Sequence, residues 1–253
     1  MSAMAISWIA FACLFSGAVL GMLLRRILPE RHLTADSKDV VKLGMGLIAT
    51  MSALVLGLLI ASAKGSYDTQ RNEVTQMSAD IVQLDRVLAH YGPQAKEVRD
   101  HERGVVMIAL MTIWSDRGFR SEKLDSRALR SEADHFYEDI QKLAPQNDFQ
   151  RTLQSQAMQI SAEVGRIRSL LLEQTGGSIP MPFLVVLIFW LAMIFVSFGL
   201  FAPPNSTVIG VLCVCALSVA GAIFLILELD RPFEGLLRIS SEPVRNALTR
   251  LGQ

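Results

Sequence analysis

The chain has 253 residues, 51% of them hydrophobic, and its 24 Lys and Arg residues balance 24 Asp and Glu residues. A mean hydropathy of +0.37 is too high for an ordinary soluble domain of this length. The composition therefore excludes most soluble classes and indicates a membrane protein.

Four uncharged stretches are long enough to cross a hydrocarbon core of about 30 Å, which needs about 20 helical residues. They cover residues 4–24, 43–63, 181–201 and 207–228. The first is followed at once by Arg25 and Arg26 rather than by a small-residue cleavage site, so we expect a retained helix. Glu228, the last residue of the fourth stretch, is the only charged residue within the four stretches.

The second span continues into polar sequence without a proline, as "KLGMGLIATMSALVLGLLIASAKGSYDTQ" at 42–70. Small residues recur along it every four positions, and the first span carries a Gly-xxx-Gly pair. Such patterns favour close helix packing, either of the first span on the second or of the second on copies of itself. The predicted packing residues are Gly17, Gly21, Ala49, Ala53, Gly57 and Ala61.

A second stripe is predicted on the opposite side of the same helix. Its residues follow at steps of three, four and four, and are Leu47, Thr50, Leu54 and Leu58. In a ring of subunits this stripe would face a narrow apolar lumen of the kind that gates by dewetting. In any other arrangement it would face lipid.

Residues 64–178 form a polar insert with 15 Lys and Arg against 17 Asp and Glu, so it offers no basic patch for nucleic acid. An apolar seam opens it, at Val74, Met77, Ile81, Leu84, Leu88 and Tyr91. Gly92 and Pro93 then end the first helix. Three further helices are predicted at 94–116, 126–144 and 147–174. The expected fold is all-α, with a helical bundle continuous with the membrane helices.

The short link "APPNS" makes the third and fourth spans a hairpin. After them, Glu228 and Arg231 stand at i, i+3 spacing and are predicted to form an ion pair at the membrane boundary. Ser241 can cap a last amphipathic helix. This helix either lies on the membrane surface or packs on a neighbouring element, and we expect the packing. The predicted parts are a first transmembrane hairpin (1–63), the insert (64–178), a second hairpin (179–230) and the tail (231–253).

The sidedness signals conflict. Lys and Arg near the membrane are more numerous on the side of the insert and both termini, which favours a cytoplasmic location for these parts in a bacterial inner membrane. The pair Arg25 and Arg26, directly after an uncharged first span, argues for the reverse.

The sequence contains no recognisable catalytic or metal-binding pattern. The four histidines lack metal-ligand spacing, and Cys13, Cys213 and Cys215 all lie in predicted spans, so no metal or cofactor site, disulfide framework or enzyme is predicted. "DHER" at 100–103 is interpreted as a solvated helix face. The spans lack internal charged residues, which disfavours a pump or an ion-coupled carrier.

Four segments together resemble a bacterial bestrophin-like membrane-protein family. They are "DVVKLGMGLIATMSALVLGLLIASAKGSYDTQ", "LDRVLAHYGP", "IPMPFLVVLIFWLAMIFVSFGLFAPPNSTV" and "CALSVAGAIFLILELDRPFEGLLRISSEPVRNALTRLGQ". The order of spans and insert is also similar to that of true bestrophins, which are pentameric ion channels whose second span lines the pore. The aromatic-rich neck and the acidic calcium-binding run of true bestrophins are not found in this sequence.

Two hypotheses follow. The resemblance implies a homo-oligomer, with the pentamer as candidate stoichiometry, that conducts inorganic ions along the second span. The alternative is a membrane-anchored sensor or scaffold without transport activity, in which the long helix leaving the membrane carries a signal or docks a partner.

Overall fold

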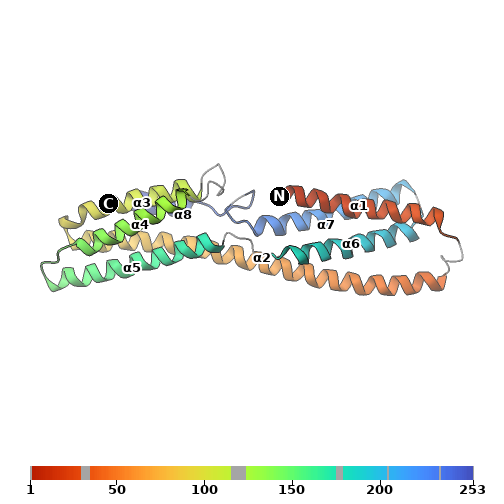
Figure 1. The fold of residues 1–253 in the computed structure, drawn as a ribbon, viewed down its shortest axis with the longest axis horizontal. Coiled ribbons are helices and arrows are strands. Elements are labelled where there is room, and N and C mark those ends of the chain that lie inside the picture. The colour runs from red at the N-terminus through yellow and green to blue at the C-terminus, as the bar shows by residue number, and fades with distance from the viewer. Residues whose placement is uncertain are drawn as a thin grey trace. The chain divides into compact units, whose positions relative to one another are not determined.

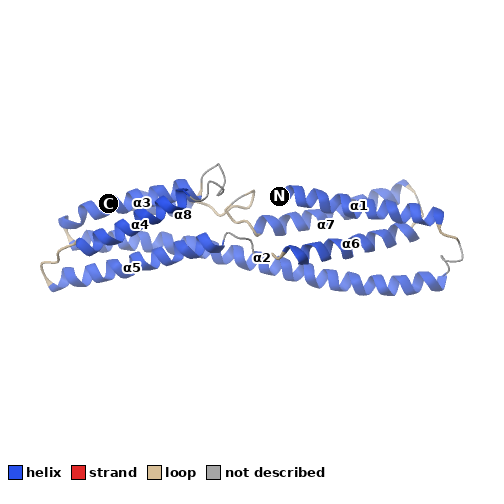
Figure 2. Cartoon of the chain, in the orientation of Figure 1, coloured by secondary structure: helices blue, strands red, loops and turns tan. Residues whose placement is uncertain are grey.

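The computed structural model describes residues 2–29, 35–114, 124–174, 179–203, 205–233 and 235–252. Within these ranges the regular structure is entirely helical (Figures 1 and 2). The α-helices are α1 (Ala3–Ile27), α2 (Ala35–Tyr91), α3 (Lys96–Ile113), α4 (Leu124–Lys142), α5 (Asp148–Glu173), α6 (Met181–Phe201), α7 (Ser206–Leu229) and α8 (Glu242–Arg250). The all-α prediction is confirmed.

Four of these helices are long and apolar enough to cross a membrane, namely α1, α2 from Lys38 onward, α6 and α7. Their ends lie within a few residues of the predicted ones, except that α2 begins at Ala35, eight residues before the predicted span. As expected, α2 continues beyond the membrane stretch without interruption. The chain divides into two compact units: residues 1–66 with 177–230, and residues 67–176 with 231–253. We call them the membrane unit and the bundle unit.

In the membrane unit, α1 packs against both α6 and α7 (Figure 1). One cluster joins Ala10 of α1 to Leu184 of α6 and Ile223 of α7, and a second joins Leu14 to Phe195 and Ala216. These apolar side chains interlock over most of the length of α1. At its end, Arg25 Nη1 donates a hydrogen bond to the carbonyl oxygen of Ala202, which α6 leaves unpaired.

In the bundle unit, the apolar seam of α2 forms the core. All six predicted seam residues, from Val74 to Tyr91, are buried. The amino-terminal half of the seam packs with Ile167 and Leu171 of α5, and the other half with Phe136 and Ile140 of α4. The seam is therefore bundle core and presents no surface of its own to a lumen.

The breaks in the bundle unit have local causes. Gly92 adopts φ = 119°, a region that favours glycine, and Pro93 opens a short 3-10 helix before α3. Between α4 and α5, Asn147 caps α5 by accepting a hydrogen bond from the Gln150 amide at 2.8 Å. These residues set the reversals that make an antiparallel bundle.

The tail packs on the bundle, as expected. Val244, Ala247 and Leu251 are buried beside the α2 seam, and Trp114 Nε1 donates a hydrogen bond to the Ile239 carbonyl at 2.9 Å. Ser241 stands at the N-cap position of α8, as predicted, but its side chain makes no capping hydrogen bond; Ser240 Oγ accepts a hydrogen bond from the Glu242 amide instead. Phe149, in the first turn of α5, is 63% exposed.

Candidate pore-lining surface

The membrane stretch of α2 is the least covered of the four candidate spans. Only 11% of its apolar window is buried within the chain, compared with 33%, 33% and 28% for α1, α6 and α7. One narrow face is covered: Leu59 and Ala63 pack with Leu187 of α6 and Ile226 of α7. The rest of the helix surface is available to lipid or to another subunit.

The stripe Leu47, Thr50, Leu54 and Leu58 lies on this uncovered surface. The three leucines are 65%, 71% and 64% exposed, and Thr50 is exposed as well. Thr50 Oγ1 donates to the Gly46 carbonyl at 2.9 Å, which leaves its oxygen as the one polar acceptor in the stripe. At roughly 100° per residue, the centre of the stripe lies about 155° from the covered face.

The small-residue ridge is also uncovered. Ala49, Ala53, Gly57 and Ala61 are all exposed, and a Cβ atom added at Gly57 would meet no described atom within 4 Å. By the same helical geometry, ridge and stripe are roughly 85° apart, so they are neighbouring faces and not the opposite faces that we expected. A copy of the chain packed against the ridge would therefore not have to cover the adjacent leucine stripe.

The Gly-xxx-Gly pair of α1 faces a partner that the sequence did not suggest. A Cβ atom at Gly17 would lie 3.1 Å from the Ala192 carbonyl oxygen, and one at Gly21 would overlap the backbone of α6 at Val196. Gly199 of α6 is equally close to the backbone of α1 at Ala18. The close approach is therefore between α1 and α6, and the alternative of tight packing between the first two spans is wrong for these two glycines.

The two residues of the predicted ion pair at the membrane boundary differ in burial. Glu228 is buried at 8% exposure near the end of α7, whereas Arg231 is exposed. Their ion pair remains a prediction. Among the described residues, no group of three or more His, Cys, Asp or Glu side chains is placed to hold a metal ion.

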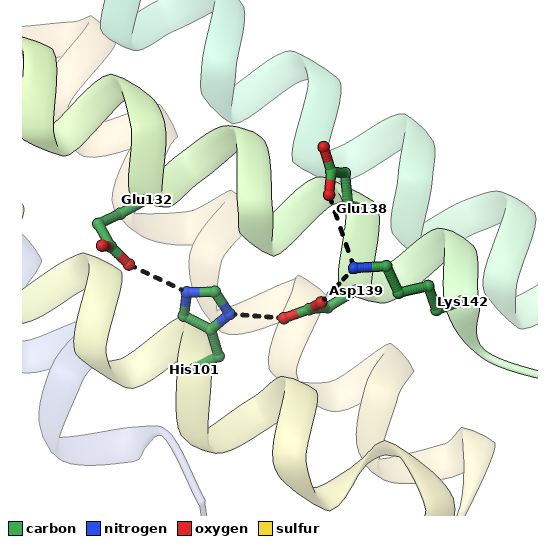
Figure 3. A network of polar contacts seen from close by, with 5 residues as sticks. All are labelled: His101, Glu132, Glu138, Asp139 and Lys142. Atoms are coloured by element: carbon green, nitrogen blue, oxygen red, sulfur yellow. Dashed lines mark hydrogen bonds and ion pairs between the residues drawn. The ribbon is translucent and has the colours of Figure 1, made fainter.

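The "DHER" segment of α3 is a solvated face only in part, because Asp100 and Arg103 are exposed whereas His101 is half-buried and Glu102 is buried. His101 is 24% exposed at its side chain, and its Nδ1 lies 2.8 Å from Asp139 Oδ2 of α4 (Figure 3). Its Nε2 lies 3.4 Å from Glu132 Oε2, and Lys142 Nζ lies 3.3 Å from Asp139 Oδ1. The hydrogen bond with His101 lowers the pKa of Asp139, and Lys142 adds to that shift against partial desolvation. The cluster ties α3 to α4.

Glu102, next in the chain, is only 2% exposed. Desolvation raises the pKa of its carboxyl well above the ordinary value, helped by the nearby Asp85 and opposed by Arg99. The sequence carried a signal for this burial, since Glu102 stands four residues after Val98 and four before Val106, both of which are buried on the same face of α3.

Four apolar spans and a helical bundle define an all-α, multi-pass membrane protein. A family model described as "Bestrophin-like domain" matches residues 12–244, so the chain belongs to the bestrophin-like family. No curated protein matches the chain.

The fold is similar to solved structures of a bacterial bestrophin homologue from Klebsiella pneumoniae, in three variants that each carry one mutation. The first has 15% identity and a TM-score of 0.66, with 97% of this chain and 98% of that chain covered. The second has 16% identity and a TM-score of 0.66, covering 100% and 99%. The third has 14% identity and a TM-score of 0.64, covering 98% and 99%. At these identities the likeness establishes the fold.

Proposed function

We propose that this protein is a homo-oligomeric ion channel in which α2 surrounds the axis and the stripe Leu47, Thr50, Leu54 and Leu58 forms the constriction. The observation that carries the proposal is the uncovered membrane stretch of α2, which presents a small-residue ridge and a leucine stripe on neighbouring faces. Membership of the bestrophin-like family supports the same reading.

The two faces suit different contacts in a closed ring. Ala53 and Gly57 allow the backbone of another helix to come close, so the ridge is suited to a neighbouring subunit. The adjacent stripe then turns toward the axis, where leucine side chains narrow the path and exclude water until it widens. The bilayer covers α6 and α7, and inorganic ions are the transported species. A pentamer is the stoichiometry that we propose.

We also propose that the protein lies in the bacterial inner membrane, with the bundle unit and both termini in the cytoplasm. The excess of Lys and Arg on that side supports this orientation. At the boundary, Glu228 and Arg231 are proposed to pair.

A planar bilayer containing the purified chain, under a salt gradient, tests the proposal. The reversal potential of the current reports cation against anion selectivity. Leu54→Ser should raise the conductance because it widens the constriction and makes it wetter. Leu217→Ser is the matched control, since Leu217 is a 55% exposed leucine on α7. Silence from folded protein across pH, calcium and voltage would overturn the channel.

One observation favours the alternative of a sensor or scaffold. Helix α2 is a single helix of 57 residues that belongs to both units, so a displacement in the membrane stretch can be passed along it. A dimeric state without current, together with a soluble protein that co-purifies, would favour this function.

A further inference from the structure

A cavity of about 180 Å³ lies inside the bundle unit. Its wall is mostly apolar and is built from five helices, with Ile81 and Leu84 from α2, Val106 from α3, Phe136 from α4 and Val244 from α8, together with α5. All five of these side chains are buried. A cavity of roughly 150 Å³ with a similar lining accepts benzene in another protein, so this one has room for a small organic molecule.

Glu102 is the unexpected member of this wall. Its side chain is 2% exposed, and neither carboxyl oxygen has a hydrogen-bond partner among the described residues. A buried carboxyl without partners is costly and rare in native proteins, and it calls for a partner that is not part of the chain. The cavity beside it is the place where such a partner can lie.

The surrounding charges favour a cation. Asp85 and Arg99, the charged neighbours of Glu102, are joined to each other by two hydrogen bonds of 2.7 and 2.9 Å. The wall itself contains Asp134, which is exposed, and Arg168, which is half-buried and has an interaction of its own. With Glu102 ionised, the wall carries two carboxylates and one guanidinium, so its net charge is negative.

We propose that this cavity binds a small primary amine with an apolar body, whose ammonium group is held by Glu102. The apolar wall would cover the body of the ligand, and the ammonium group would supply hydrogen-bond donors for both unpartnered carboxyl oxygens. The proposal does not depend on ion conduction.

The proposal has a protonic consequence. In the empty site the raised pKa keeps Glu102 protonated to higher pH than an ordinary glutamate. An amine is already an ammonium ion in neutral water. Where the Glu102 carboxyl is protonated before binding, binding converts it into a carboxylate paired with the ammonium ion, and its proton passes to the buffer. Up to one proton is released for each amine bound, and no bond other than the O–H bond breaks.

Calorimetric titration of the full chain in lipid nanodiscs, corrected with empty nanodiscs, tests the site. Benzylamine is the probe and benzyl alcohol its uncharged counterpart. We expect benzylamine to bind about tenfold more tightly than the alcohol, as a charged hydrogen bond allows. Its binding heat should change with the ionisation enthalpy of the buffer.

In Glu102→Gln, both the preference for the amine and the proton release should disappear, while the alcohol still binds. Asp134→Asn is the control for a carboxylate at the exposed part of the wall, and it should keep both properties. Absence of benzylamine binding to the unmodified chain would overturn the proposal, and so would an unchanged preference in Glu102→Gln.

A second pair of variants tests the location without touching Glu102. Gly165 of α5 lines the cavity, and a Cβ atom there would meet nothing within 4 Å. Gly165→Leu should fill the cavity and abolish binding of both probes. Gly104→Leu, at an exposed position of α3 with equal free space, makes the same change outside the cavity and should leave binding intact. Equal binding in the two variants would place the ligand elsewhere.

Discussion

Arg99 and Asp85 form a two-hydrogen-bond ion pair between α3 and α2 of the bundle unit. Arg99 Nε donates to Asp85 Oδ1 at 2.7 Å, and Nη2 donates to Oδ2 at 2.9 Å, which joins α3 to α2. The backbone amide of Gly252 adds a third hydrogen bond to Asp85 Oδ2 at 3.2 Å. The carboxylate therefore fastens the carboxyl-terminal tail to the same point.

Loss of this pair should destabilise the bundle strongly. The side chains of Asp85 and Arg99 are 5% and 21% exposed, and removal of one partner from a buried pair costs about 3–5 kcal/mol. Asp85→Asn should lower the free energy of unfolding by an amount near the lower end of that range. Chemical denaturation monitored by tryptophan fluorescence measures it. Asp100→Asn, which removes an exposed pair with Lys96, should change it by less than about 0.5 kcal/mol. Equal effects of the two variants would contradict this account.

The close contact between α1 and α6 should not tolerate a side chain. Gly199→Leu places a Cβ atom onto the backbone of α1 at Ala18, so the helices must separate. We expect the free energy of unfolding to fall by more than about 3 kcal/mol, which exceeds the cost of ordinary overpacking. The measurements are the recovery of folded protein, which should be poor, and the unfolding temperature in detergent, which should be lower. Gly210→Leu on α7, where a Cβ atom meets nothing within 4 Å, should be recovered normally.

Glu102 should make the chain less stable as the pH rises. Its folded-state pKa is raised, so the folded chain holds its proton where the unfolded chain has already released it. The contribution of Glu102 to the free energy of unfolding is therefore largest below the unfolded pKa of about 4.3, and it falls as the pH increases toward the folded pKa. Glu102→Gln should unfold at a higher temperature than the unmodified chain near pH 7, with the difference vanishing near pH 4. A variant that is less stable at neutral pH would show that the carboxylate has a stabilising partner.

Asp139 should contribute with the opposite sign. Its pKa is lowered in the folded state, mainly by the hydrogen bond with His101, so its contribution is present above the unfolded pKa and is lost as the pH falls through the folded pKa. Asp139→Asn should lower the free energy of unfolding by no more than about 1 kcal/mol near pH 6, because the carboxylate is partly exposed. The loss should shrink below about pH 3, a range set by the ordinary aspartate pKa. Thermal unfolding between pH 3 and pH 7 measures both, and an effect independent of pH would contradict the assignment.

Elements that depend on hydropathy or periodicity could be predicted from the sequence. The fourth span was expected at 207–228 and is Ser206–Leu229, because an apolar run of this length satisfies its backbone hydrogen bonds within the membrane as a helix. The α2 seam was expected residue by residue, since spacing of three and four places Val74 and Leu88 on one face.

Features that depend on tertiary contact could not be predicted in this way. The glycines of α1 show that a helix approaches closely, but nothing in Gly17 or Gly21 specifies α6 as that helix. The spacing of Glu102 from Val98 and Val106 indicates the buried face of α3, but it does not show that the carboxyl lies there without a hydrogen-bond partner among the described residues. The leucine stripe of α2 is exposed in the single chain, so its proposed role in a pore depends on contacts beyond that chain.

The most direct test of the pore is block of the current by a charged, membrane-impermeant thiol reagent. In a background where Cys13, Cys213 and Cys215 are replaced by alanine, Leu54→Cys should be modified from the aqueous path and lose most of its conductance. Leu217→Cys, on the exposed surface of α7, should keep its current. Block at Leu54→Cys alone is the result that this account predicts. Full current after treatment of Leu54→Cys, and of the neighbouring Leu47→Cys and Leu58→Cys, would contradict the assignment of α2 to the pore.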